Sequence, residues 1–427
     1  MRPRTEQEPP ADGKARFVEE RLYTRDYATL FGVEFALFGV YYTLLPVIPL
    51  YIVELGGTEA TVGLIMGLMA PVAALGTPIY GMAVDQWSRK RTAAIGFVIA
   101  AAGVLLLPVI AKPWLLIFPD LLRRVGTSAT GAATRTALID IAPIARRGEA
   151  ISTITISHNL ATAVGPLIGL ALMQRSGIVP VVAVCAGLAV FGALGIVPIR
   201  GSRTPAELAN PVDARRFDDR PRSPGVSARQ KILLRTVTPQ AWMPAVVLFL
   251  FVAAFFGTLA FVSLLGDRRG ISGFGTFFTV YGVVVIGSRL VVGRLSDRYG
   301  RRTVLAPCLV LGIFSMILLG RADNLAMLLA AGIVLGIGWG SAFPTLLTLA
   351  ADLSPVDRYG TTMAMMSAAF AFGTAVGAIV VGSIAEKWGF DVAYGLIAGL
   401  LILALVVLLG ESRSMRKAGA GRVNASV

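Results

Sequence analysis

The sequence is dominated by long apolar stretches, each close to the length that a helix needs to cross a membrane. A helix crosses the hydrocarbon core of a bilayer with about 20 apolar residues. Twelve stretches have this character: 28–53, 61–84, 92–111, 114–139, 150–173, 178–199, 242–265, 272–293, 303–320, 325–350, 361–385 and 390–410. With 55% hydrophobic and only 15% charged residues, the chain has too much apolar surface for a water-soluble fold. The sequence therefore predicts an all-α integral membrane protein with twelve transmembrane helices, and it excludes a soluble enzyme.

A polar stretch over residues 200–240, with five prolines and nine Lys/Arg, separates six apolar stretches from the other six. We interpret it as a linker, because its composition is that of a segment without a core of its own. The predicted organisation is a leader 1–27, an N-terminal six-helix bundle 28–199, a linker 200–240, a C-terminal six-helix bundle 241–411 and a tail 412–427.

The net charge of +14 reflects the arrangement of the basic residues along the chain. If the N-terminus is cytoplasmic, 29 of the 39 Lys/Arg lie in inside segments, six in outside loops and four within spans. This bias follows the positive-inside rule, so both termini are predicted to be cytoplasmic, in a plasma or bacterial inner membrane. The excess charge then determines topology, and nucleic acid is not expected as a partner. One histidine and two cysteines predict neither a metal site nor a bound cofactor.

An internal repeat relates the two halves of the chain at a constant offset of 212 residues. Charged loop residues recur in register, together with glycines of the fifth helix and of the loop that follows it. The pairs include Gly81/Gly293, Asp85/Asp297, Arg89/Arg301, Asp140/Asp352, Gly148/Gly360, Gly165/Gly377 and Gly177/Gly389. Two repeated six-helix halves predict a pseudo-symmetric pair of bundles with a binding site between them near mid-membrane.

The loop after the eighth apolar stretch reads Gly293-Arg-Leu-Ser-Asp297-Arg298-Tyr-Gly300-Arg301-Arg302. It resembles the cytoplasmic loop motif of the major facilitator superfamily, a family of secondary transporters. The equivalent loop from Gly81 keeps the glycine, the aspartate and the final basic cluster, but it has Gln86 where the family usually has arginine. The resemblance implies the fold of that family, with twelve helices in two six-helix bundles.

In the family, residues of this motif form a cytoplasmic latch that holds the outward-facing state. The resemblance assigns the latch to Gly81, Asp85, Arg89, Asp140, Gly293, Asp297, Arg298, Arg301 and Asp352. The alternative is that these charges only determine topology.

The fifth apolar stretch carries a second resemblance. It keeps the Gly165-Pro166-x-x-Gly169 part of the glycine-rich sequence found in antiporters of the superfamily, although other usual glycines are replaced. The resemblance implies exchange of a substrate against protons. The alternative is that the small side chains serve only to pack two helices closely.

Ionisable residues within spans are expected to serve function, because a charge in the membrane is costly. Glu34 lies about 10 Å into the first span and is the candidate proton carrier, with Arg124 or Arg135 as its counter-charge. The alternative is a static ion pair of Glu34 with Arg135. Asp120, at the start of the fourth span, is predicted to lie near the outer face and to be partly hydrated.

Polar and aromatic residues within the spans are candidates for the wall of a substrate cavity. They are Tyr41, Tyr42, Arg123, His158, Asn159, Phe256, Arg289 and Trp339. For the aromatic residues the alternative is packing between helices, for His158 a neutral hydrogen-bonding role, and for Arg289 contact with backbone carbonyls.

The predicted function is secondary active transport by alternating access, driven by the proton gradient. The favoured direction is export of a small amphipathic organic molecule in exchange for protons. The alternative is proton-coupled uptake or exchange of an organic anion, and a more remote alternative is a membrane receptor or scaffold that does not transport. The expected partners are the lipid bilayer, a small-molecule substrate and protons, and the protein is expected to be a monomer.

Overall fold

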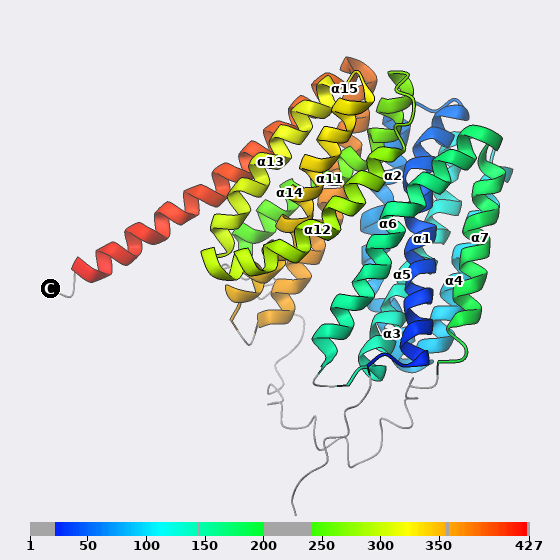
Figure 1. Cartoon of the computed structure of the whole chain (residues 1–427), viewed down its shortest axis with the longest axis horizontal. Coiled ribbons are helices and arrows are strands. Elements are labelled where there is room, and N and C mark those ends of the chain that lie inside the picture. The colour runs from blue at the N-terminus through cyan, green and yellow to red at the C-terminus, as the bar shows by residue number, and fades with distance from the viewer. Residues whose placement is uncertain (1–21, 144–145, 200–240, 356–357, 425–427) are drawn as a thin grey trace, which may run out of the picture.

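The computed structural model describes residues 22–143, 146–199, 241–355 and 358–424, and within these ranges it contains helices but no β-strand (Figure 1). The helices form two bundles, which confirms the predicted all-α fold. Eight of the described helices are long and apolar enough to cross a membrane by length and composition. Most of the predicted leader and the whole of the predicted linker lie outside the described residues.

The N-terminal bundle contains the first six predicted spans. Its helices are α1 (Arg25–Glu54), α2 (Glu59–Leu75), α3 (Thr77–Gln86), α4 (Arg89–Leu106), α5 (Ile117–Ile141), α6 (Arg147–Ser176) and α7 (Ile178–Gly195). Two short 3-10 turns, Leu107–Val109 and Pro113–Leu116, connect α4 to α5. The second predicted span is interrupted at Gly76, because Pro78 cannot donate the backbone hydrogen bond that would join α2 to α3.

The C-terminal bundle contains the other six spans. Its helices are α11 (Trp242–Arg268), α12 (Thr276–Tyr299), α13 (Arg301–Arg321), α14 (Leu325–Asp352) and α15 (Tyr359–Asn424). Gly389, with a φ of 83°, divides α15 into the last two spans. Gly177, between α6 and α7, has a φ of 72° and precedes Gly389 by the repeat offset. A side chain with a Cβ would be strained at both positions, so the repeated glycines form the same turn in each half.

Contacts between the bundles are concentrated at one end of the molecule. α2 packs against α15 there, and α6 and α1 contact α12 and α11. Figure 1 shows the bundles close together at the top, where α2 and α15 meet, and farther apart toward the bottom. We call the end where α2 begins the closed end.

Glycines allow the close approach of α2 and α15 at the closed end. A Cβ on Gly63 would lie 2.5 Å from the carbonyl oxygen of Ala378, and one on Gly382 would lie 2.4 Å from that of Glu59. Real Cβ atoms do not approach backbone atoms so closely. Small residues of this kind let helix backbones pack tightly within a membrane.

Candidate functional site

A cavity of about 640 Å³ lies between the two bundles. α1, α2 and α5 line it from one side, and α11, α14 and α15 line it from the other. Most of the lining residues lie between the middle of their helices and the end of the molecule opposite the closed end. The cavity therefore extends from the centre of the molecule toward that opposite end.

One wall of the cavity is a continuous stripe along α5. It consists of Arg124, Thr127, Ser128, Gly131, Ala132 and Arg135. The spacing of three and four residues places all six on one face of the helix. Arg124 and Arg135 stand about 16 Å apart along the helix axis, because eleven residues each rise 1.5 Å. Small and hydroxyl side chains occupy the space between the two arginines.

The facing wall belongs to the other bundle and is more apolar. From α15 it takes Met363, Met366, Ser367, Phe370, Ala371 and Thr374. The Phe370 ring contacts Phe256 of α11 and Phe343 of α14 edge to face, with ring centroids 5.3 and 5.7 Å apart. The cavity thus has a basic and hydroxyl-bearing wall on α5 and an aromatic wall opposite it.

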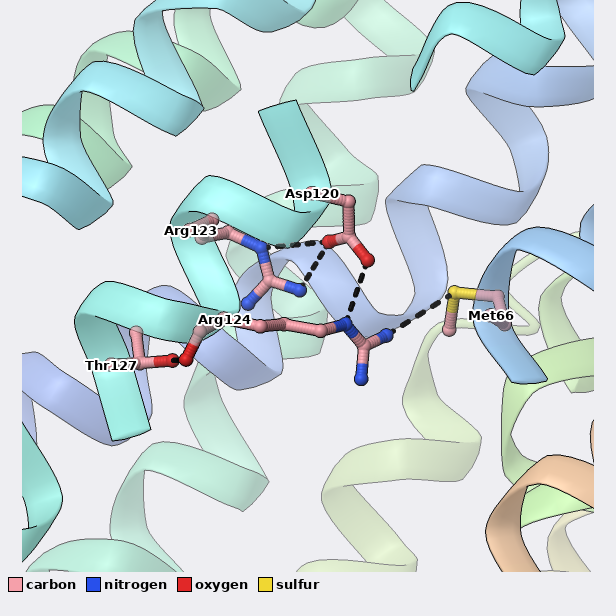
Figure 2. Close-up of polar contacts among 5 residues, drawn as sticks. All are labelled: Met66, Asp120, Arg123, Arg124 and Thr127. Atoms are coloured by element: carbon pink, nitrogen blue, oxygen red, sulfur yellow. Dashed lines mark hydrogen bonds and ion pairs between the residues drawn. The ribbon is translucent and has the colours of Figure 1, made fainter. Parts of the chain in front are cut away.

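A buried charge cluster supports Arg124 at the deep end of the α5 stripe (Figure 2). One carboxylate oxygen of Asp120 accepts hydrogen bonds from Nε and Nη2 of Arg123, at 3.0 and 2.5 Å. The other oxygen accepts a hydrogen bond from Nε of Arg124 at 2.7 Å. Nη2 of Arg124 also lies 3.9 Å from the sulfur of Met66. One carboxylate therefore holds two guanidinium groups, and the cluster has a net charge of +1.

The burial of Asp120 corrects the sequence prediction. Asp120 lies in the first turn of α5, but it is fully buried rather than partly hydrated. The spacing of three and four residues to Arg123 and Arg124 puts the two arginines within reach of its carboxylate on one helix. That spacing in the sequence could have identified the cluster.

Glu34, the predicted proton carrier, is buried in α1 with 7% of its surface exposed. Its carboxyl group interacts with two residues of α5: the Thr134 hydroxyl group through a hydrogen bond and the Arg135 guanidinium through its charge. Glu34 lies outside the cavity lining, whereas Arg135 lines it. Arg135 therefore belongs to the cavity wall and also acts electrostatically on the buried carboxyl group.

A second polar cluster lies where α1, α6 and α12 meet. The Tyr42 hydroxyl group lies 2.8 Å from Nε2 of His158, whose ring stacks on Phe38 at a centroid distance of 3.9 Å. Arg289 donates to the side-chain oxygen of Asn159 at 3.2 Å, which links α12 to α6 across the two bundles. Of these residues only Phe38 lines the cavity.

The remaining predicted cavity residues divide between the wall and the packing behind it. Tyr41 and Phe256 line the cavity. Trp339 lies behind the wall, stacked between Phe255 and Phe343 at centroid distances of 3.5 and 5.3 Å. Arg123 is buried beside Tyr41, with its guanidinium carbon 5.9 Å from the ring centroid.

Two ion pairs related by the repeat lie at the end opposite the closed end. Arg89 lies 3.1 Å from Asp140, and Arg301 lies 3.2 Å from Asp352. Each pair joins two helices of the same bundle: α4 to α5 in the first case and α13 to α14 in the second. We call this the latch end, because the four residues belong to the predicted latch.

For the other residues of the predicted latch, the structure describes fewer contacts. The guanidinium of Arg298 lies over the ring of Tyr299, at 5.5 Å from its centroid. The side chains of Asp85 and Asp297, as well as the surroundings of Gly81 and Gly293, lie outside what the structure describes.

The closed end carries contacts between the bundles that sequence analysis missed. Arg268 at the end of α11 pairs with Glu59 at the start of α2, at 2.7 Å. Glu386 of α15 accepts a hydrogen bond at 3.1 Å from the backbone nitrogen of Ala60. The helix dipole by itself favours an acidic residue such as Glu59 at the start of a helix. The sequence therefore does not indicate that Glu59 pairs with a residue of the other bundle.

Among the residues that the structure describes, no group of three or more His, Cys, Asp or Glu side chains could hold a metal ion. The described site is a cavity between two repeat-related bundles, with basic side chains on one wall and aromatic ones on the other. This arrangement is typical of a membrane transporter in which substrate binds between two halves.

Comparison with known proteins identifies the family. The profile described as Major Facilitator Superfamily matches residues 30–296 and 272–425. The chain belongs to this superfamily and is a multi-pass membrane transporter.

Known relatives agree with this assignment. An uncharacterised transporter of the same type from Salmonella typhimurium is 25% identical over 358 residues, covering 80% of this chain and 85% of the relative. Multidrug resistance protein 3 of Bacillus subtilis is 28% identical over 159 residues, covering 36% of this chain and 31% of the relative. The crystal structure of the nucleoside transporter NupG has the same fold, with a TM-score of 0.72 at 17% identity, covering 91% of this chain and 99% of that one.

Proposed function

We propose that this transporter moves a small amphipathic organic molecule through the central cavity by alternating access, coupled to protons through Glu34. The observation that carries the proposal is the cavity itself, which both bundles line, while glycines of α2 and α15 pack the bundles together at the closed end. A substrate in it contacts both halves, so a rocking of one half against the other would change the side from which it is reached.

The proposed topology places both termini in the cytoplasm, in a plasma or inner membrane, as the distribution of Lys and Arg predicts. The latch end then faces the cytoplasm and the cavity extends toward the cytoplasmic side. In this interpretation the conformation is inward-facing, and the opposite conformation requires the contacts of the closed end to separate.

Proton coupling is proposed for Glu34 because of its position. Glu34 is buried, and Arg135, which acts electrostatically on its carboxyl group, lines the cavity. When Glu34 is ionised it engages Arg135, and when it is protonated Arg135 is released toward the cavity. A proton and a substrate can therefore influence each other through one guanidinium group.

Export in exchange for protons is the direction that the antiporter-like sequence from Gly165 to Gly169 supports, as does the name of the relative Multidrug resistance protein 3. The second candidate is proton-coupled uptake or exchange of an organic anion. The basic wall of α5 favours this second candidate.

Proton flux in vesicles tests the coupling for any substrate that the protein accepts. The purified full chain is reconstituted into vesicles that contain the pH-sensitive dye pyranine, and amphipathic cations, neutral compounds and anions are added outside. We expect at least one class to drive proton movement in wild-type protein, and the sign of the pH change distinguishes exchange from co-transport.

Two glutamates of α1 provide the variant and its control. Glu34→Gln should abolish the substrate-dependent proton movement and leave downhill substrate exchange intact. Glu54→Gln removes an exposed carboxylate at the end of the same helix and should change nothing. Equal proton movement in Glu34→Gln and wild type would refute the carrier role.

A further inference from the structure

We propose that the cavity selects an amphipathic organic anion, whose acidic group binds Arg124 and whose apolar part lies against the aromatic side chains of the opposite bundle. The inference rests on the proposed transport function, since it names the class of molecule transported. It concerns binding, which can be measured without transport.

The charge of the cavity is the first argument. Among the lining residues that the structure describes, Arg124 and Arg135 are charged and none is acidic. Asp120 is shared by two arginines, so the cluster that ends at Arg124 has an excess positive charge. A charge at this depth is costly unless it is paired. An anion in the cavity would neutralise the excess, whereas an organic cation would add to it.

The unused hydrogen-bonding capacity of the cluster is the second argument. A guanidinium group has five N–H donors. Arg124 directs one to Asp120, and a second only approaches the Met66 sulfur, which is a weak acceptor. The Nη1 atom of Arg123 is buried without a hydrogen-bond partner. Donors of Arg124 thus remain for a carboxylate or similar group, which guanidinium binds with two parallel hydrogen bonds.

The cavity surface between the two arginines, together with the facing wall, determines what shape the rest of the ligand can have. Gly131 and Ala132 leave room beside the α5 backbone, between Arg124 and Arg135 and nearer to Arg135. Across the cavity, the Phe370 ring and its aromatic neighbours present an apolar surface. A volume of about 640 Å³ suits a molecule of ordinary drug size. A ligand with one acidic end and one aromatic or aliphatic end matches both walls.

The test compares ligands that differ only in charge. Naphthalene, benzene and decane skeletons are used, each carrying a carboxylate, a neutral carboxamide or an ammonium group. Ligand-dependent increases in the unfolding temperature of the detergent-purified full chain give apparent dissociation constants. We expect the carboxylates to bind and the naphthalene carboxylate to bind at least about tenfold more tightly than its amide, as expected for hydrogen bonds to a charged group. Equal binding of the amide, a preference for ammonium, or no binding of any carboxylate would overturn the proposal.

Variants locate the binding site. Arg124→Gln should weaken carboxylate binding about tenfold or more and remove the preference over the amide, while Arg124→Lys should retain part of that preference. Arg321→Gln removes an exposed arginine at the end of α13 and should leave binding unchanged. Phe370→Ala should weaken all the naphthalene ligands without changing their order. A preference for carboxylate that persists in Arg124→Gln would refute this binding site.

The binding and proton-movement assays together distinguish a failure of the anion site from a failure of the proposed proton coupling. Carboxylate binding that depends on Arg124, without any proton movement in the pyranine assay, would support the anion site and refute proton coupling. Proton movement driven by organic cations but not by carboxylates would support coupling and refute the anion site.

Discussion

The closed end depends on backbone contact between α2 and α15, so a single methyl group at Gly63 should open it. The Cβ of Gly63→Ala would lie 2.5 Å from the carbonyl oxygen of Ala378 and 3.2 Å from the Cα atom of Gly382. Both are backbone atoms and cannot move aside by a change of rotamer. Ordinary contact begins at 3.4 Å, so the two helices must separate by about 1 Å.

The magnitude follows from the cost of overpacking, which is about 1–3 kcal/mol for an extra methyl group in a packed interior. Separation of the bundles at the closed end relieves this cost, because the contact is then lost. The balance between closed and separated conformations should therefore shift by a factor of about 5 to 150.

Cysteine accessibility measures this shift. Cys185 and Cys308 are buried and are replaced by serine, and a reporter cysteine is placed at Ala375, which is 7% exposed in this interface. Gly63→Ala should accelerate labelling of the reporter by maleimide in detergent solution. Gly187→Ala, where a Cβ would meet no atom within 4 Å, is the matched control and should not. Equal labelling rates in the two variants would refute the reasoning.

Three further predictions concern ion pairs. Asp120→Asn leaves two buried guanidinium groups without their carboxylate and should lower the free energy of unfolding by about 3–5 kcal/mol, measured by denaturation in detergent; unchanged stability would contradict the burial argument. Arg268→Gln removes the partner of Glu59, whose side chain is 11% exposed; because the Arg268 side chain is 54% exposed, water can take its place, and the change should cost about 1 kcal/mol or less, so reporter labelling should rise less than in Gly63→Ala. Asp140→Asn should destabilise the protein more than Asp352→Asn, because the Asp140 side chain is 15% exposed and that of Asp352 is 53% exposed; equal losses of thermal stability would contradict this ranking.

Much of the fold could be predicted because each span carries its own signal. An apolar run of membrane length predicts a helix regardless of its neighbours, and the repeat predicts two similar halves. Positions that the repeat relates also have the same structure. Gly177 and Gly389 form the same turn, and Arg89 and Arg301 form equivalent ion pairs. The break at Gly76 was missed, because the apolar run continues through it and only the backbone is interrupted.

The site was less predictable, because a sequence does not state which helix faces meet across two bundles. Arg124 and Arg135 lie on the cavity face of α5, but Arg123, one residue from Arg124, is turned into the bundle. His158 and Asn159 are polar residues of α6 that were predicted to line the cavity, yet they contact α1 and α12 instead. The pairing of Glu59 with Arg268 depends on how the bundles are placed together, which neither helix specifies.

Alternating access between the two ends is the central claim, and paired distance measurements test it most directly. Spin labels at Glu54 and Lys387 report the separation of the bundles at the closed end, and labels at Arg91 and Tyr359 report it at the latch end. All four positions are exposed. Between acidic and alkaline buffer, in lipid, we predict that one distance lengthens as the other shortens. Two distances that stay constant, or that lengthen and shorten together, would contradict the account.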